Sequence, residues 1–321
     1  MSRSLNGRVA VVAGATRGAG RGIARMLGEA GATVYCTGRS SREHPGMPGR
    51  AGRPETIEET AEMVAAAGGT GISVRVDHTD EKQVAALFAR VAREQDRLDV
   101  LATVMTGQPA SWKSFLDDTP ASGRAFVDGW IWPHIVTAWH AAALMAKRKS
   151  GLIVELVEQD NVGYHGAFYF DIMETLLKRL VFGLANDLGR SGVTAVAVAP
   201  GYMRTEAILD GYGVTEANWR DAVGRPQAAA MGWGGSETPC FTGRAVAALA
   251  ADPDVARKNG GVHTVRALAE EYGFTDIDGR RPDHAVLDAA VEQAKKTFLA
   301  PMLEGARLTS VDWTLSRKSG S

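Results

Sequence analysis

Short apolar runs alternate along the chain with longer segments in which apolar residues recur every three or four positions. The short runs indicate strands buried on both faces, and the longer segments indicate amphipathic helices. Their alternation predicts an α/β fold: a doubly wound parallel sheet of about seven strands with helices on both faces. The expected strands are Arg8–Ala13, Thr33–Thr37, Gly71–Val76, Asp99–Met105, Leu152–Val157, Val193–Ala199 and Val262–Val265.

Helices are expected in the intervals between these strands. Pro54, followed by three glutamates within five residues, predicts a helix start with proline in the first turn and acids at the positive end of the helix dipole. The expected helices are Gly20–Ala30, Pro54–Ala67, Glu81–Arg93, Arg124–Lys147, Phe168–Leu188 and Gly243–Ala251.

Three segments depart from this minimal pattern. Ser40–Arg53 is rich in Gly, Pro and Arg and predicts an inserted loop, whereas Met203–Thr238 mixes aromatic, glycine and charged residues, as a mobile lid over a site does. Pro282–Leu303 predicts an amphipathic helix. We therefore expect one domain over residues 1–270, with an inserted loop at 40–53 and a substrate lid at 203–238. A C-terminal helical extension over 271–321, used for packing or subunit contacts, follows it.

Composition narrows the possible partners. The 321 residues carry 36 Lys+Arg and 37 Asp+Glu, a formal net charge of −1, which favours neither a nucleic acid nor a membrane surface. No apolar run is long enough to cross a bilayer. Cys36 and Cys240 are the only cysteines, which is typical of a reducing compartment and predicts a cytoplasmic location. The seven histidines show no metal-ligand spacing, so no metal is expected.

A glycine-rich turn follows the first strand and leads directly into a helix. Small residues let the backbone approach a pyrophosphate, whose charge is then met by the N-terminus of the helix. The predicted phosphate-binding residues are Gly14, Thr16, Arg17, Gly18, Ala19 and Gly20.

The end of the second strand indicates which dinucleotide is bound. An acid there would accept hydrogen bonds from a ribose, but the chain has Arg39 and Ser40 instead. Arg39, helped by Arg17, can bind a 2′-phosphate, which favours NADP(H); the alternative is that both arginines are solvated surface charges. Asp77 and His78 follow the third strand, where an adenine would lie.

Together, several motifs resemble the short-chain dehydrogenase/reductase family over residues 7–265. They are Gly14-x-x-x-Gly18-x-Gly20, Asp77, Gly151-Leu152-Ile153-Val154, and Ala199-Pro200-Gly201-x-x-x-Thr205. The resemblance implies a Rossmann-like domain, a small-molecule substrate and a homodimer or homotetramer. It also implies that the segment around the nicotinamide contributes Pro200, Gly201, Met203 and Thr205.

The resemblance further implies a catalytic Ser, a Tyr-x-x-x-Lys pair and an upstream Asn, and this chain departs from all of them. Counting along the chain puts Phe170 at the Tyr position, Glu174 at the Lys position and Glu158, give or take one residue, at the Ser position. The Asn position falls near Trp130, and Thr103–Thr106 replaces the family's turn after the fourth strand. Candidates for a relocated acid, each equally suited to loop or core packing, are Tyr164, His165 and Tyr169.

These exchanges change the charge of the predicted catalytic site from positive to negative. A unit charge at 4 Å interacts by about 4 kcal/mol at an effective dielectric near 20, so carboxylates disfavour an oxyanion and favour a cation. An iminium ion accepts hydride without a proton donor, which predicts reduction of an iminium or similarly polarised substrate. Tryptophan faces that could attract such a cation are Trp112, Trp130, Trp132 and Trp139.

Simpler interpretations stand beside this one. Glu174 lies one turn before Lys178 and could form a local ion pair with it. Glu158 could be a solvated turn residue, and the tryptophans could pack in the hydrophobic core. Two other functions also remain open. One is a redox-neutral cyclase, dehydratase or isomerase that keeps the dinucleotide as scaffold, and the other is a catalytically inactive NADP(H)-binding protein.

Overall fold

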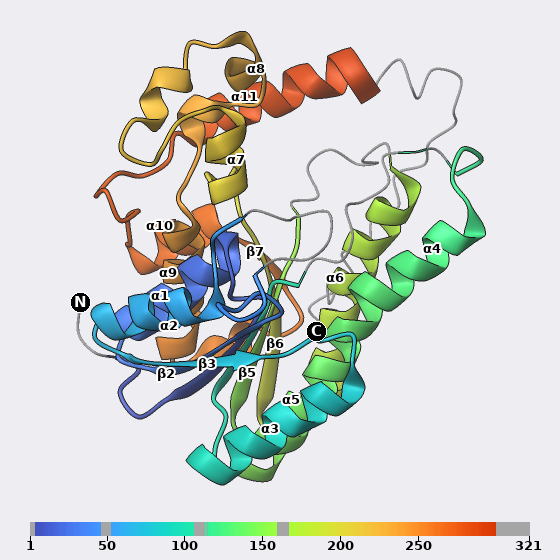
Figure 1. The fold of residues 1–321 in the computed structure, drawn as a ribbon, viewed down its shortest axis with the longest axis vertical. Coiled ribbons are helices and arrows are strands. Elements are labelled where there is room, and N and C mark those ends of the chain that lie inside the picture. The colour runs from blue at the N-terminus through green and yellow to red at the C-terminus, as the bar shows by residue number, and fades with distance from the viewer. Residues whose placement is uncertain (1–3, 46–52, 106–112, 114, 159–166, 300–321) are drawn as a thin grey trace, which may run out of the picture.

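The central sheet has the strand order β3-β2-β1-β4-β5-β6-β7, and all its pairings are parallel (Figure 1). The computed structural model describes residues 4–45, 53–105, 113, 115–158 and 167–299. The order reverses between β1 and β4, so the carboxyl ends of these strands form the crevice where such sheets bind ligands. The strands are β1 (Val9–Ala13), β2 (Thr33–Gly38), β3 (Thr70–Arg75), β4 (Val100–Thr103), β5 (Gly151–Leu156), β6 (Val193–Ala199) and β7 (Val262–Thr264).

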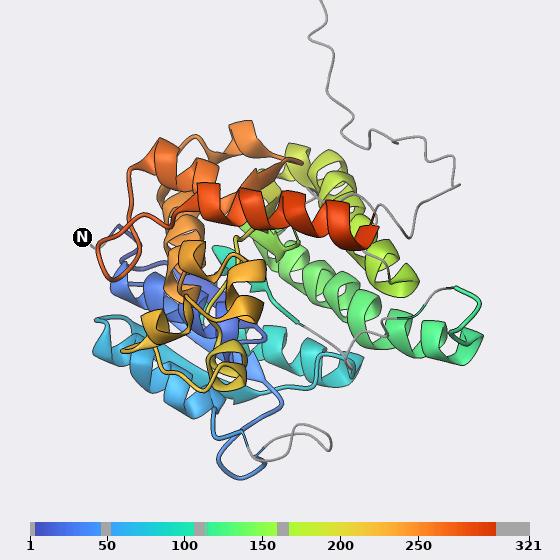
Figure 2. The ribbon, with the colours of Figure 1, turned by 90° about the horizontal axis from the view of Figure 1, so that it is seen from above.

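The predicted α/β fold with seven strands is confirmed, and the helices cover both faces of the sheet (Figures 1 and 2). They are α1 (Gly18–Glu29), α2 (Ile57–Ala66), α3 (Glu81–Gln95), α4 (Pro120–Phe126), α5 (Trp132–Arg148), α6 (Phe168–Leu188), α7 (Glu206–Gly211), α8 (Pro226–Ala230), α9 (Pro239–Ala251), α10 (Val265–Tyr272) and α11 (His284–Ala294).

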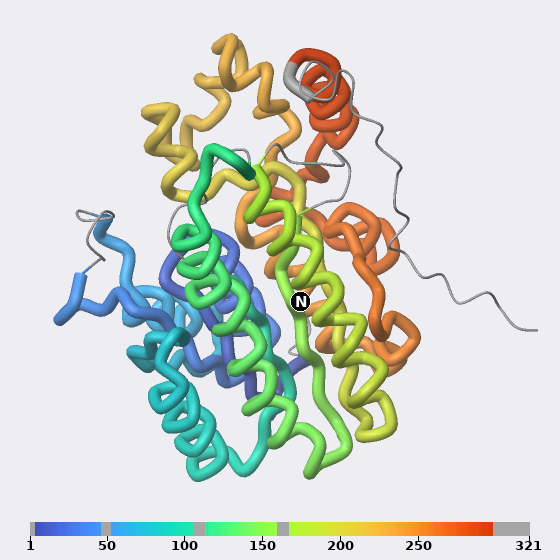
Figure 3. The backbone as a smooth tube through the Cα atoms, turned by 90° about the vertical axis from the view of Figure 1, so that its right-hand side faces the viewer, coloured from blue at the N-terminus to red at the C-terminus, as the bar shows by residue number. Residues whose placement is uncertain are grey.

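Alternation of side chains along the strands builds one hydrophobic core on each face. In β1, Val9 and Val11 join the core beneath α3, α5 and α6, whereas Ala10 and Val12 join the core beneath α1, α2, α9 and α10. Figure 1 shows the two layers on opposite sides of the sheet, and Figure 3 looks onto the layer that contains α3, α5 and α6. A sheet covered on both faces needs apolar residues at successive positions, which is why the strands are nearly continuous apolar runs.

Three helix predictions were wrong in detail, and one of them is α9, which begins at Pro239 rather than Gly243. Helix α2 begins at Ile57 rather than Pro54, because the hydroxyl of Thr56 accepts a hydrogen bond from the Glu59 amide and caps the helix there. The single helix expected over Arg124–Lys147 is interrupted by a π-helical turn at Val127–Ile131. Pro133 has no amide hydrogen to continue the regular ladder, which explains the change of hydrogen-bond pattern immediately before it.

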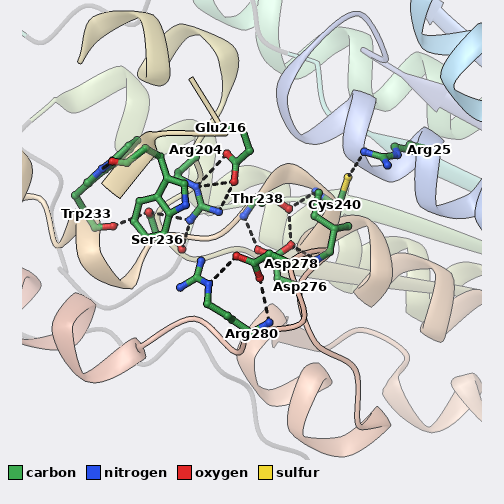
Figure 4. Close-up of polar contacts among 12 residues, drawn as sticks. Arg25, Arg204, Glu216, Trp233, Ser236, Thr238, Cys240, Asp276, Asp278 and Arg280 are labelled. Carbon is green, nitrogen blue, oxygen red and sulfur yellow. Dashed lines mark hydrogen bonds and ion pairs between the residues drawn. The ribbon is translucent and has the colours of Figure 1, made fainter. Parts of the chain in front are cut away.

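Residues 203–238 form short helical pieces with a small core of their own, which includes Val214, Trp219 and Trp233. The Arg204 side chain is buried beneath this segment, 2.7 Å from Glu216 and stacked 4.1 Å from the centre of a Trp219 ring (Figure 4). Packing of this kind describes a folded cap rather than an irregular loop.

The chain enters and leaves the cap at neighbouring positions, which we call the neck. The Arg204 amide donates to the Glu237 carbonyl at 2.8 Å, and the Glu237 amide donates to the Tyr202 carbonyl at 2.9 Å. Just beyond the neck, Asp276 receives hydrogen bonds from both the amide and the hydroxyl of Thr238, which fixes the start of α9 (Figure 4). The two ends of the cap are therefore held side by side.

Helix α11 packs across the cap (Figure 2). A Cβ added to Gly235 would lie 2.2 Å from the Asp283 carbonyl oxygen, so the cap and the start of α11 are in close contact. The amphipathic helix expected over Pro282–Leu303 thus runs from His284 to Ala294 and continues as a π-helical turn to Leu299. The remainder of that expected helix lies outside the described residues.

Candidate functional site

The glycine-rich turn between β1 and α1 is tightly packed. Gly14 has a φ of +94°, and a Cβ there would lie 2.6 Å from the carbonyl oxygen of Val104, at the end of β4. A Cβ on Gly20 would lie 2.1 Å from the Gly14 carbonyl oxygen. Glycine at both positions therefore lets the turn close directly over the crevice between β1 and β4.

The start of α1 already holds an anionic oxygen. The Gly18 amide donates to Oε2 of Glu206 at 2.8 Å, and Arg21 Nε lies 3.7 Å from the other oxygen of that carboxylate. Amide groups and a positive helix dipole that bind a carboxylate also suit a phosphate. The turn thus fits a dinucleotide pyrophosphate. Two other predicted residues of this turn are buried: Ala19 in the first turn of α1, and Thr16 against Gly38.

Positive charge gathers beside the end of β2. Arg17 lies 3.3 Å from the carboxylate of Glu55, and Arg53 binds the same carboxylate at 2.6 Å. Arg39 is partly buried, and its carbonyl accepts a hydrogen bond from Arg75. Arg53 was not among the predicted cofactor residues, because it falls at the end of a segment expected to be only an inserted loop. Residues 46–52 of that loop lie outside the described residues.

Two predicted adenine neighbours have different surroundings. Asp77 caps its own turn by accepting hydrogen bonds from the amide and hydroxyl of Thr79, and its carboxylate is at the surface. His78 points inward, with one ring nitrogen 2.8 Å from the Thr37 hydroxyl and the other 3.0 Å from the Thr137 hydroxyl. Burial lowers the pKa of His78 to about 3, so the ring is neutral. His78 thus connects β2 to α5 through the hydroxyls of Thr37 and Thr137. Ser40, another predicted cofactor residue, is buried at the start of the loop that follows β2.

The turn after β6 meets the glycine-rich turn. Thr205 lies against Gly18, since a Cβ on that glycine would be 3.4 Å from the Thr205 methyl carbon. Met203 pairs with Glu237 in the neck of the cap, and a Cβ on Gly201 would lie 2.8 Å from a carboxylate oxygen of Glu237. Complete burial raises the pKa of Glu237 to about 8. Of the predicted set Pro200, Gly201, Met203 and Thr205, Thr205 thus contacts the glycine-rich turn, whereas Gly201 and Met203 lie against Glu237 in the neck of the cap.

A buried carboxyl group lies at the carboxyl end of β5. Glu174, on the first turns of α6, is 4% exposed, and its Oε2 accepts a hydrogen bond from the Glu158 amide at 2.6 Å. Burial raises the pKa of Glu174 to about 7, with the charge of Glu158 adding to the effect and Lys178 opposing it. The Glu158 side chain itself is exposed. Two of the predicted catalytic residues are thus in direct contact, and one of them titrates near neutrality.

A second buried pair lies next to this group and was missed by sequence reasoning. His134 Nδ1 is 2.6 Å from Glu155 Oε2, and the Thr103 hydroxyl donates to the same oxygen. Nε2 of His134 donates to the Met105 carbonyl at 3.1 Å, so the contact with Glu155 holds a single proton between the two groups. Burial alone would lower the pKa of His134, but the Glu155 carboxylate holds that pKa above its ordinary value, with Glu174 acting in the same direction.

One sequence signal could have pointed to Glu155, although not to its partner. Glu155 is a charged residue inside an otherwise apolar strand, and such residues are rarely buried without a partner. The partner comes from the strand register, which places Thr103 of β4 beside Glu155 of β5, and from α5, which covers this face.

The aromatic residues do not gather around the carboxylates as predicted. Trp132 is 45% exposed and donates to Glu81, and Trp139 is 67% exposed. Trp130 is buried and stacks on Phe126 in the core. Residues two positions apart in a helix, such as Trp130 and Trp132, point to different sides, whereas Trp132 and Trp139 are two turns apart and share the exposed side of α5. Trp112, Tyr164, His165 and Thr106 lie outside the described residues.

Phe170 and Tyr169 lie on the first turn of α6. Phe170 packs against the core beneath α5 and α6. The Tyr169 hydroxyl donates to the Thr119 carbonyl at 3.4 Å, and its ring lies against Gly123 of α4. The Tyr169 hydroxyl is therefore directed toward α4, whereas Glu174 faces the end of β5.

Comparison with known proteins places this arrangement in a family. A family model described as enoyl-(acyl carrier protein) reductase matches residues 14–255. Dehydrogenase/reductase SDR family member 1 of Homo sapiens is 34% identical over 287 residues, covering 87% of this chain and 86% of that protein. This chain belongs to the short-chain dehydrogenase/reductase family. It is thus an oxidoreductase of the short-chain type.

Other short-chain dehydrogenases/reductases agree with this assignment. Oxidoreductase UcpA of Salmonella typhimurium is 28% identical over 207 residues, which cover 63% of this chain and 71% of that protein. The fold is also that of a short chain dehydrogenase from Mycobacterium thermoresistibile, with a TM-score of 0.68 at 19% identity over 85% of this chain and 90% of that one. Members of the family generally bind NAD(P)(H), act on small molecules and often form oligomers.

Over the described ranges, no three His, Cys, Asp or Glu side chains come together in a way that could hold a metal ion. Within the same part of the chain, none of the helices combines the length and apolar character needed to cross a bilayer.

Proposed function

We propose that this chain is an NADP(H)-dependent oxidoreductase that reduces an iminium or similarly polarised carbon in a small organic molecule. In this proposal an acidic pocket replaces the Ser, Tyr and Lys of the family, with Glu174 as its central residue. The protein acts in the cytoplasm as a homodimer or homotetramer, as the low cysteine content and the family suggest.

The observation that carries the proposal is the contact between Glu174 and the Glu158 amide. It puts a buried carboxyl group at the carboxyl end of β5, on the helix where the family motif has its Tyr and Lys. A carboxylate there repels the negative oxygen that forms when a ketone is reduced. It attracts a positively charged group instead.

An iminium carbon can be reduced without a protein acid. The dinucleotide, when bound, supplies the hydride. A C–H bond forms at the iminium carbon, the π electrons of the C=N bond move to nitrogen, and the positive charge is lost. Glu174 binds and orients the cation, and the phenyl group of Phe170 replaces a phenol that this reaction does not need.

Two arginines support a preference for NADP(H) over NAD(H). Arg39 immediately follows β2, where a ribose-binding acid would stand, and Arg17 lies at the start of α1 beside Arg53 and Glu55. Guanidinium groups recognise a phosphate with paired, charge-assisted hydrogen bonds. Replacing Arg39 with Ala should weaken NADPH binding and leave NADH binding nearly unchanged, as measured by fluorescence titration.

The proposal is tested by measuring consumption of NADPH with cyclic imines and with ketones of matched size. The Glu174→Gln variant should lose roughly a hundredfold in kcat/KM on imines, the effect of about 3 kcal/mol from one nearby charge. Glu62→Gln, which removes an exposed carboxylate on α2, is the matched control. Failure of the native protein to bind NADPH, or equal rates for the native protein and Glu174→Gln, would contradict the proposal.

The near-neutral pKa of Glu174 favours a second candidate, a redox-neutral cyclase, dehydratase or isomerase. A carboxyl group that titrates near pH 7 is well matched to general acid–base catalysis. This candidate predicts that a substrate is converted with NADPH bound but not consumed. A double variant, Phe170→Tyr with Glu174→Lys, tests the inherited scaffold in either case, because ketone reduction should appear if the rest of the site is intact.

A further inference from the structure

Helix α1 takes its anionic partner from a distant part of the chain. The residue before the helix, Arg17, makes no side-chain cap, yet the Gly18 amide donates to Glu206 at 2.8 Å. Glu206 is the first residue of α7, in the cap, 188 positions later. Its other carboxylate oxygen lies 3.7 Å from Arg21 Nε. One carboxylate therefore joins the start of the phosphate-binding helix to the cap.

A second ion pair fastens the same short helix. Asp210, at the other end of α7, lies 2.8 Å from Arg53, which also binds Glu55. Thr205, immediately before α7, rests against Gly18. We call the contacts of Glu206 and Asp210 the α7 latch. The latch holds α7 directly over the glycine-rich turn, beside the arginines of the proposed 2′-phosphate site.

The carboxylate of Glu206 uses the features that a phosphate would use. An amide at a helix N-terminus, the positive end of the helix dipole and a nearby guanidinium together bind either anion. Both anions cannot accept the same Gly18 hydrogen at full strength. The other carboxylate close to Arg21 is Glu59, 2.7 Å from a terminal nitrogen, which does not contact Gly18.

We propose that Glu206 sets the affinity of this chain for its dinucleotide by competing with the cofactor pyrophosphate for the Gly18 amide. This inference rests on the proposed function, because it requires that a dinucleotide binds at the glycine-rich turn. Cofactor binding displaces Glu206 and so releases one of the two ties of the α7 latch. Entry of the cofactor and opening of the cap at α7 are then one coupled event.

The test compares NADPH binding by the native chain, Glu206→Gln and Glu59→Gln, using fluorescence titration of the full-length protein. Glutamine keeps the shape of the side chain but removes the charge. Loss of one charge-assisted contact should tighten the binding of NADPH to Glu206→Gln by roughly tenfold. Glu59→Gln, which removes a carboxylate from the same arginine without touching Gly18, should bind NADPH like the native chain.

A second measurement follows the latch without any cofactor. Hydrogen exchange of the backbone amides over residues 205–212 should be several-fold faster in Glu206→Gln than in the native chain or in Glu59→Gln, whereas exchange in β1 and β6 should be unchanged. Asp210→Asn should also speed exchange over 205–212. It should tighten NADPH binding by less than Glu206→Gln does, because the change loosens the same latch but Asp210 does not contact the Gly18 amide.

The outcomes separate the two proposals. If the native chain binds NADPH and Glu206→Gln binds it equally or more weakly, the competition is refuted while the proposed function stands. If neither protein binds NADPH, both the proposed cofactor and the competition are wrong. Unchanged exchange over residues 205–212 in Glu206→Gln would show that the carboxylate does not hold α7, and this result also overturns the inference.

Discussion

Replacing Glu174 with Gln removes the charge of the buried carboxyl group and keeps an oxygen that can accept the Glu158 amide. Burial raises the pKa of Glu174 to about 7 in the folded chain, from an ordinary value of 4.5. The folded protein therefore keeps the proton in a pH range where the unfolded chain has already released it. Stability contributed by this group is fully present below about pH 4.5 and is lost as pH rises toward 7.

The size of the effect follows from the shift in pKa. A difference of about 2.5 units corresponds to about 3 kcal/mol of unfolding free energy when fully expressed, and to roughly 2.5 kcal/mol between pH 5 and pH 8. The native chain should thus lose that much more stability than Glu174→Gln over this range. Other titrating groups, such as Glu237, are present in both proteins and cancel in the comparison.

Urea unfolding at pH 5 and pH 8 measures this difference directly. The control is Glu62→Gln, whose carboxylate is exposed on α2, and which should follow the native pH dependence. Parallel pH dependences for the native chain and Glu174→Gln would refute the assignment of a buried, near-neutral carboxyl group at this position.

Three other changes test neighbouring parts of the structure. Glu155→Leu leaves His134 buried without its partner and should cost roughly 3–5 kcal/mol of unfolding free energy, whereas the double change His134→Leu with Glu155→Leu should cost less. Additive losses of the two single changes in urea unfolding would contradict the pairing. Glu237→Gln should raise the melting temperature relative to the native chain more at pH 9 than at pH 5, because the pKa of Glu237 is raised to about 8 and its charged form is disfavoured in the folded state. Equal differences in melting temperature at the two pH values would contradict the raised pKa of Glu237. Gly14→Ala should abolish NADPH binding or folding, since its Cβ would lie 2.6 Å from the Val104 carbonyl; native binding by this variant, measured by fluorescence titration, would disprove that close approach.

The fold was predictable because its signals are local. Continuous apolar runs such as Val193–Ala199 indicate buried strands, and the glycines of the first turn indicate a backbone that approaches another backbone closely. Both signals follow from residues within a few positions of each other. The usual right-handed crossovers restrict the possible strand orders without determining one.

The site was predictable only in part, because several of its contacts depend on distant pairings. Glu158 and Glu174 were named from spacing along the chain, and the structure puts them in contact. His134 and Glu155 meet through the register of β4 and β5 and the packing of α5, which no local pattern encodes. The contact between Gly18 and Glu206 spans 188 positions and depends on how the cap folds back.

The neck at Tyr202–Arg204 and Glu237 joins the cap to the rest of the chain at two neighbouring points, so that the cap is an exchangeable unit, or cassette. Its entry and exit are held together by two backbone hydrogen bonds, and its interior is filled by its own tryptophans rather than by the sheet. Cassettes of other lengths and shapes could be grafted between these two points while the seven strands keep their register. Within this architecture, the cap can diversify by replacement of one contiguous stretch of chain.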